Sequence, residues 1–192
     1  MKTRLFGFIW FVVSLATTPI GQVGDVVRNE KYHFSIAAPR GAAVVENDRS
    51  VMNFSADPKV HGPLARFSVT SVRQVAMPLE EIVPYLKMQA TSKLFERTMI
   101  GAMRSAFPDV RALHSDAIEF RKRTALEGMF TFTADKSPMR GRYLIVLVEE
   151  QRSLYTFTWS SEERFFAKWN KAIEDSVGSL KVANKLGPLD AE

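Results

Sequence analysis

The chain has 192 residues, 46% of them hydrophobic and 24% charged, with 26 lysines and arginines against 21 aspartates and glutamates and a formal net charge of +5. This composition is typical of a globular protein with a hydrophobic core and excludes a disordered or low-complexity chain. The chain contains no cysteine, which excludes a disulfide framework, a cysteine nucleophile and a lipid-modified cysteine.

The first 24 residues have the three-part layout of a secretory signal peptide. Lys2 and Arg4 precede the apolar run Leu5–Ala16, and small or polar residues follow it. The run is shorter than the about 20 apolar residues that a membrane-spanning helix needs. We expect cleavage after Ala16 or a few residues later, which gives a soluble periplasmic or secreted protein. Loss of Lys2 and Arg4 lowers the net charge from +5 to +3.

No Gly/Ser-rich or Pro-rich linker divides the remainder of the chain. We therefore expect a single α+β domain over residues 25–183, followed by a flexible tail at 184–192. The first strand is predicted at Tyr32–Ala38, which alternates and stops at a proline-glycine turn. An antiparallel meander with a loop at Asp57–Pro63 is expected next, its strands being Ala42–Val45, Val51–Ser55 and Leu64–Val75.

From Pro78 the apolar residues recur at steps of three and four, which predicts an amphipathic helix. Glu80 and Glu81 suit its first turn, where the helix dipole favours negative charge. Pro84 lies near enough to the start to be tolerated, and the helix must end by Pro108.

Long strands follow this helix. They are predicted at Val110–Phe120 and Thr124–Ala134, with turns at Arg121–Arg123 and Asp135–Pro138. A hairpin then joins Tyr143–Val148, apolar throughout and so covered on both faces, to the alternating strand Leu154–Trp159. The connection Glu149–Arg152 is polar and is expected to be exposed.

A last helix is predicted directly after the hairpin. Ser160 and Glu163 have the spacing of a capping box, and an apolar stripe follows. The stripe consists of Phe165, Phe166, Trp169, Ile173, Val177 and Leu180. Blocks of antiparallel strands separated by helices indicate an α+β layered fold, and not an alternating parallel one.

Three segments carry a family resemblance: the opening YHFSIAAPRG, the middle LEEIVPYLKMQ, and the closing LYTFTWSSEERFFAKWNKAIEDSVGSLKV with Phe166, Ser176 and Leu180. With the order of elements, they resemble the Mog1/PsbP-like superfamily over nearly the whole mature chain, as in PsbP-like or DcrB-like exported bacterial proteins. The resemblance implies a three-layer α/β/α sandwich around a mainly antiparallel β-sheet. It also implies an accessory or binding factor, since one branch serves photosystem II and another a small nuclear GTPase.

Candidate catalytic and metal-binding residues are few. His33, His61 and His114 have no pair spacing that would put two metal ligands on one face, so we expect no metal site. His33 and His114 are expected on strands, and His61 in a loop. His114, Ser115 and Asp116 form no hydrolase triad, because neighbours on a strand point to opposite faces. We expect no catalytic residues and no cofactor.

Basic residues near the predicted turns form a candidate binding patch for an acidic protein or an anionic membrane surface, provided that they gather at one end of the strands. They are Arg121, Lys122, Arg123, Lys136, Arg140 and Arg142. The alternative is that these charges only keep the strand ends soluble. No basic-aromatic motif indicates nucleic-acid binding.

The leading hypothesis is an exported, non-enzymatic accessory protein that binds an unidentified protein partner. The alternative is a carrier of a small apolar ligand, with its pocket between helix and sheet. A hydrolase is the third hypothesis, and the lack of a clustered nucleophile and base argues against it.

Overall fold

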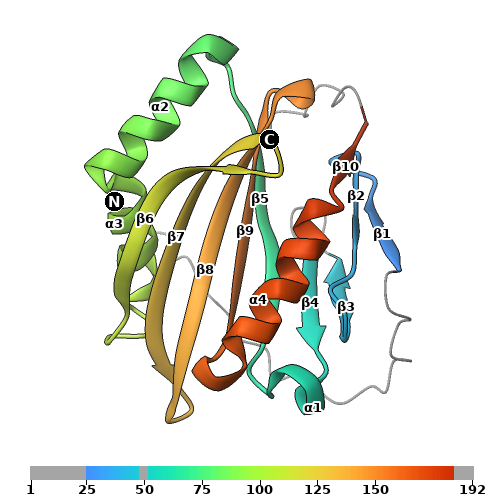
Figure 1. The fold of residues 1–192 in the computed structure, drawn as a ribbon, viewed down its shortest axis with the longest axis vertical. Helices are drawn as coiled ribbons and strands as arrows, with labels where there is room; N and C mark the ends of the chain where they lie inside the picture. Colours follow the sequence, from blue (N-terminus) through green and yellow to red (C-terminus); the bar gives the residue numbers. More distant parts are fainter. Residues whose placement is uncertain (1–24, 48–51, 184–192) are drawn as a thin grey trace, which may run out of the picture.

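The computed structural model describes residues 25–47 and 52–183. The predicted signal peptide, residues 1–24, and the predicted tail, residues 184–192, lie outside the described residues. Within the described ranges the chain forms a seven-stranded sheet, a three-stranded sheet and α-helices (Figure 1).

The large sheet is antiparallel throughout, with the strand order β3-β4-β5-β9-β8-β7-β6. The predicted meander is confirmed as β3, β4 and β5, and the predicted long strands as β6 to β9. The strands are β3 (Ala42–Asn47), β4 (Met52–Ala56), β5 (Arg66–Gln74), β6 (Arg111–Phe120), β7 (Arg123–Ala134), β8 (Ser137–Val148) and β9 (Ser153–Glu162).

The central hairpin of β8 and β9 forms as predicted, with Tyr143–Val148 buried on both faces and β9 alternating. Its connection contains the short 3-10 helix η1 (Glu149–Gln151). The expectation that this whole connection is exposed is wrong for Gln151, which is buried. Tyr155 Oη donates to Gln151 Oε1 at 2.5 Å, and Gln151 Nε2 donates to the Ala183 carbonyl at 2.9 Å. The buried amide of Gln151 therefore links the β8-β9 hairpin to Ala183, the last described residue.

Helix α4 (Glu163–Gly178) starts later than the predicted capping box requires. Ser160 and Ser161 still pair with β8, and β9 ends only at Glu162. The capping-box prediction is therefore wrong, because cross-strand hydrogen bonds extend the strand past the serine. Glu162 occupies the N-cap position without a side-chain cap bond. The predicted apolar stripe is confirmed from Phe166 to Val177, whereas Phe165 is only half-buried and Leu180, although buried, lies beyond the end of the helix.

The predicted helix after Pro78 is divided in two. α2 (Leu79–Ser92) and α3 (Leu94–Met103) meet at Lys93, whose left-handed φ of 54° ends the first helix. Pro84 lies inside α2 in its second turn, as predicted.

Two features of the N-terminal region were not predicted. The expected loop Asp57–Pro63 contains the short helix α1 (Pro58–His61), whose N-cap carboxylate, Asp57, accepts from the Lys59 amide. The first predicted strand, β2 (Phe34–Ala37), pairs with β1 (Val26–Asn29) and β10 (Lys181–Val182) in a separate small sheet.

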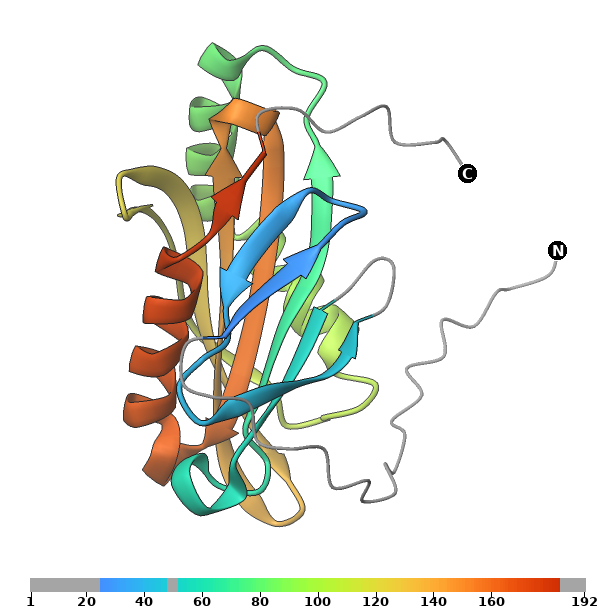
Figure 2. The same ribbon diagram turned by 90° about the vertical axis from the view of Figure 1, so that its right-hand side faces the viewer.

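The elements form three layers, with the large sheet in the middle. On β7 and β8, alternate residues pack toward different helices: Leu126 and Ile145 contact the core of α2 and α3, whereas Ala125 and Leu144 contact the core of α4. Because neighbouring residues on a strand face opposite ways, α4 and the α2-α3 pair cover opposite faces. Figure 1 looks onto the α4 face, and Figure 2 shows α4 and the small sheet from the side.

The α4 face holds the larger part of the core. Trp159, Phe157 and Tyr155 of β9 belong to the same hydrophobic cluster as Phe166 and Trp169 of α4 and are nearly inaccessible to solvent. None of the helices in the described ranges has the length and apolar composition needed to cross a membrane.

Candidate functional site

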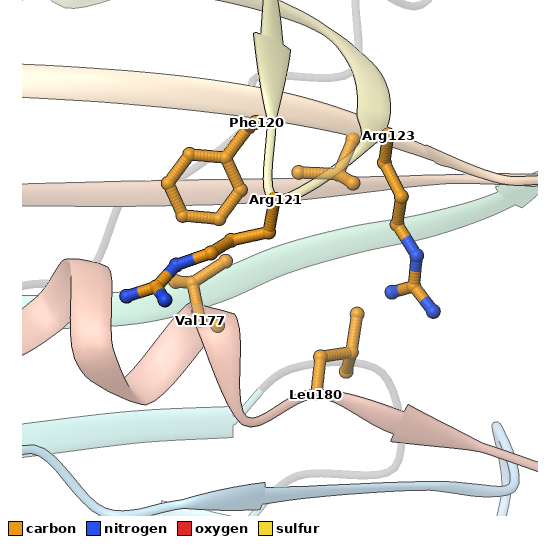
Figure 3. A pocket seen from close by; sticks show the side chains of 7 residues that line it. Phe120, Arg121, Arg123, Val177 and Leu180 are labelled. Carbon is orange, nitrogen blue, oxygen red and sulfur yellow. The ribbon is translucent and has the colours of Figure 1, made fainter.

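A small pocket lies where the β6-β7 turn passes over the C-terminal end of α4. We call it the basic pocket; it has a volume of about 150 Å³. Figure 3 shows Arg121 and Arg123 on either side of the space above Val177 and Leu180. Its lining residues are Phe120, Arg121, Arg123, Val146, Val177, Gly178 and Leu180.

The turn that carries these arginines has a tight two-residue geometry. Arg121 and Lys122 have φ values of 50° and 66°, so both central residues of the hairpin turn are left-handed. This geometry holds the Arg121 guanidinium against Gly178, where a Cβ would come within 3.0 Å of Arg121 Nε. The negative end of the α4 dipole favours a cation at this position.

Both arginines already contact carboxylates at the rim of the basic pocket. Arg121 Nη2 lies 3.3 Å from Asp175 Oδ1, and Arg123 Nη2 lies 3.5 Å from Glu150 Oε1. The four side chains are all partly exposed to solvent, so these pairs are weak and exchangeable. The basic pocket therefore offers an apolar floor with two guanidinium groups that can turn toward an incoming carboxylate.

The expectation that all six predicted basic residues gather at one end of the strands is wrong. Lys136 lies in the β7-β8 turn, at the other end of β7 from Lys122. A strand of 12 residues separates these turns by roughly 35–40 Å at about 3.3 Å per residue. Arg140 and Arg142 lie within β8. Only Arg121, Lys122 and Arg123 stay together.

Arg142 is a buried structural residue, only 8% exposed. Its guanidinium lies 5.3 Å from the centroid of the Trp159 ring and forms ion pairs with Glu127 and Glu174. Arg140 is half-buried, with its guanidinium 5.7 Å from the centroid of the Phe166 ring. Both arginines pack beneath α4 and are not part of an open basic surface.

The histidines are placed differently from the prediction in two cases. His33 lies in the turn before β2 with a φ of 50°, and not on a strand. His61 is the last residue of α1 and is buried, with its ring 4.7 Å from the Trp169 ring. His114 lies on β6 as predicted, with Nε2 3.6 Å from Glu127 Oε1. The described residues contain no cluster of three or more acidic or histidine side chains suited to a metal ion.

His114 and Ser115 contact groups on opposite faces of the sheet. His114 meets Glu127, whose other oxygen pairs with Arg142 beneath α4, whereas Ser115 Oγ accepts from Tyr143 Oη at 2.9 Å on the α2-α3 face. A proton cannot pass directly between the two side chains, which agrees with the argument against a triad.

A larger surface groove, which sequence analysis missed, runs along the other flank of α4. We call it the α4 groove; it has a volume of about 780 Å³. Its residues come from α4, α1 and the β2-β3 turn, so no local pattern could have joined them. They are Ala37, Ala38, Arg40, Gly41, Val60, His61, Lys168, Lys171, Ala172, Asp175 and Ser176.

Comparison with known proteins identifies the fold. No protein-family model matches the chain, and no curated protein matches it. The solution structure of cyanobacterial PsbP from Synechocystis matches with a TM-score of 0.59 at 12% identity, over 90% of this chain and 99% of that one. A crystal structure from Bacteroides thetaiotaomicron matches with a TM-score of 0.54 at 10% identity, over 84% of this chain and 49% of that one.

The Ran-binding protein Mog1p of Saccharomyces cerevisiae is also similar, with a TM-score of 0.48 at 11% identity, over 83% of this chain and 95% of that one. The fold is an α+β sandwich around an antiparallel sheet, similar to that of cyanobacterial PsbP, and it agrees with the fold that the sequence resemblance implied. At these identities the similarity establishes the fold alone.

Proposed function

We propose that this protein is an exported, non-enzymatic accessory protein that binds a partner protein through the basic pocket. The observation that carries this proposal is the pairing of an apolar floor with two arginines at the rim. A cavity of about 150 Å³ accommodates one aliphatic side chain, and arginines beside it can bind carboxylates through paired N–H groups. The matching partner segment carries an aliphatic residue next to Asp or Glu.

The dimensions of the basic pocket favour a side-chain anchor over a small-ligand carrier. Pockets that hold a free ligand usually have volumes of about 300–1,000 Å³, whereas the basic pocket has a volume of about 150 Å³. Phe130, Phe132 and Phe157 are buried and fill the interior beside the central strands. At the basic pocket the carrier hypothesis therefore receives less support than protein binding, whereas the α4 groove, with about 780 Å³, lies within the range of ligand pockets.

Selection from a displayed peptide library tests the binding role. We expect the purified protein to enrich peptides in which Leu, Ile or Val adjoins Asp or Glu. The double charge reversal Arg121→Glu/Arg123→Glu should abolish that enrichment, because it places carboxylates where the peptide's own carboxylates bind.

The matched control is Lys87→Glu/Arg97→Glu, which makes the same charge change on α2 and α3, in the layer on the opposite face of the sheet. This control should enrich the same peptides as the unaltered protein. The proposed role of the basic pocket would be refuted if the unaltered protein enriched no common sequence. It would also be refuted if the Arg121→Glu/Arg123→Glu variant enriched the same peptides equally well.

Export is a separate part of the proposal, supported by the basic start and short apolar run of residues 1–24. A fusion of these residues to a reporter that is active only outside the cytoplasm should be active. Substitution of two leucines of the run, Leu5 and Leu15, by arginine should abolish that activity.

A further inference from the structure

The α4 groove is positively charged along its rim and apolar along its floor. Arg40, Lys168 and Lys171 are exposed cations, and Asp175 is the one carboxylate among its lining residues. The hydrogen bond from Lys171, with further help from Arg121, lowers the pKa of Asp175, so its charge offsets one of the three cations. The groove therefore keeps an excess of two positive charges.

Small side chains line the floor between the cations. Ala37, Ala38 and Gly41 lie on the small-sheet side, and Ala172 lies on the α4 side. The α4 side of the groove runs from Lys168 to Ser176. These eight steps along α4 span about 12 Å at 1.5 Å per residue. That length matches about four residues of an extended chain.

A buried histidine fixes the turn that forms one wall. His61 is 2% exposed, and its Nε2 lies 2.8 Å from the Arg40 carbonyl oxygen. Gly41, with a φ of 75°, packs so closely on the imidazole that a Cβ would lie 3.1 Å from Nε2. His61 Nδ1 is buried without a hydrogen-bond partner in the part of the chain that the structure describes. The contacts of His61 therefore hold the wall of the groove in place, and its Nδ1 atom makes no hydrogen bond within the described residues.

One carboxylate connects this groove to the basic pocket. Asp175 Oδ1 lies 2.7 Å from Lys171 Nζ in the groove and 3.3 Å from Arg121 Nη2 at the pocket. The cations of the two sites thus follow one another around the C-terminal half of α4, joined through a single exposed side chain. A ligand that occupies both sites would cross α4 at Asp175.

We infer that the α4 groove binds an extended, acidic peptide segment of about four residues. The inference rests on the proposed function, since the same partner would place its aliphatic anchor in the basic pocket and its acidic segment in the groove. Charge complementarity selects an acidic occupant, and the small side chains of the floor leave room for an extended backbone.

The test uses a fluorescein-labelled peptide of six glutamates, which is acidic, extended by self-repulsion and without an aliphatic anchor. Fluorescence anisotropy at low ionic strength measures its affinity for the full chain. The exposed pair Lys168→Glu/Lys171→Glu should weaken binding at least about ten-fold, since like charges then face each other. The control Lys87→Glu/Arg97→Glu should bind as the unaltered protein does.

Other variants separate this inference from the proposed function. Arg121→Glu/Arg123→Glu should lose the anchored library peptides but bind hexaglutamate within about three-fold of the unaltered protein, because Lys168, Lys171 and Arg40 remain. If the unaltered protein binds hexaglutamate but enriches no common sequence from the library, the basic pocket proposal alone is refuted. If Lys168→Glu/Lys171→Glu binds hexaglutamate normally, or if the α2-α3 control loses binding equally, the groove inference is refuted.

Vesicles of phosphatidylglycerol provide the third measurement, since anionic lipid could also use these cations. Co-sedimentation that depends on Lys168 and Lys171, in the absence of any hexaglutamate binding, would assign the α4 groove to a membrane surface and overturn the peptide inference. Hexaglutamate binding without vesicle binding is the result that we expect.

Discussion

Arg142 Nη1 of β8 donates to Glu174 Oε1 of α4 across 2.5 Å, and the same guanidinium pairs with Glu127 on β7. One buried cation thus ties two strands to the helix that crosses them. Asn170 Oδ1 accepts from both Arg142 and the Trp159 indole, at 3.2 and 3.0 Å. The network explains how a charged residue is accommodated beneath α4.

Removal of the Arg142 charge should therefore strongly destabilise the fold. We expect Arg142→Met to lower the free energy of unfolding by about 3–5 kcal/mol, because Glu127 and Glu174 would be left without their buried counter-charge. Urea unfolding followed by circular dichroism measures the loss. Arg73→Met, at an exposed position of β5, is the control and should change stability by about 0.5 kcal/mol or less. Equal effects of the two substitutions would contradict this role.

Gly128 is required by the ring of Tyr143 on the neighbouring strand. A Cβ at Gly128 would lie 2.2 Å from Tyr143 Cζ, so Gly128→Ala forces a buried ring to move. We expect a loss of about 1–3 kcal/mol from overpacking. Gly101→Ala is the matched control: open space surrounds that position in α3, and the alanine should stabilise the helix by about 0.5–1 kcal/mol. Thermal unfolding of both variants should show shifts of opposite sign.

Alkaline pH should destabilise the protein through Tyr143. Burial raises the pKa of Tyr143 to about 12, and the hydrogen bond to Ser115 opposes this shift only in part. Above pH about 10 the unfolded chain loses the phenolic proton while the folded chain retains it, so stability is full below that pH and falls as pH rises toward 12. Tyr143→Phe should lose about 1 kcal/mol near neutral pH with the hydrogen bond, but its stability should decline less steeply above pH about 10. An unchanged slope in urea unfolding would contradict the assignment.

Mild acid should destabilise the protein through His61. Burial lowers the pKa of this imidazole, with Lys168 adding to the effect and the hydrogen bond to the Arg40 carbonyl opposing it. Below pH about 6.5 the unfolded chain takes up a proton that the folded chain resists, so the stability present above that pH is lost as pH falls. His61→Gln should make urea unfolding less dependent on pH between about 5 and 7. An unchanged pH dependence of the His61→Gln variant would contradict this assignment.

Much of the fold could be predicted because hydrophobic periodicity is local. The alternation of Leu154–Trp159 and the stripe from Phe166 to Val177 identify a strand and a helix, since each repeats over neighbouring residues. The short polar connection at Glu149–Arg152 then requires an antiparallel hairpin. Helix α1 could also have been found, because Asp57 followed by Pro58 is a recognised start signal.

The α+β class, the antiparallel order of the last strands and a basic turn at Arg121–Arg123 could therefore be predicted from local patterns. Which charges are available for binding depends on how the chain packs. Packing buries Arg142 under α4, places Lys136 at the far end of the sheet, and joins Arg40 to Lys168 and Lys171 in a groove. The physical reason is that periodicity indicates which face a residue occupies, whereas a site depends on contacts between residues far apart along the chain.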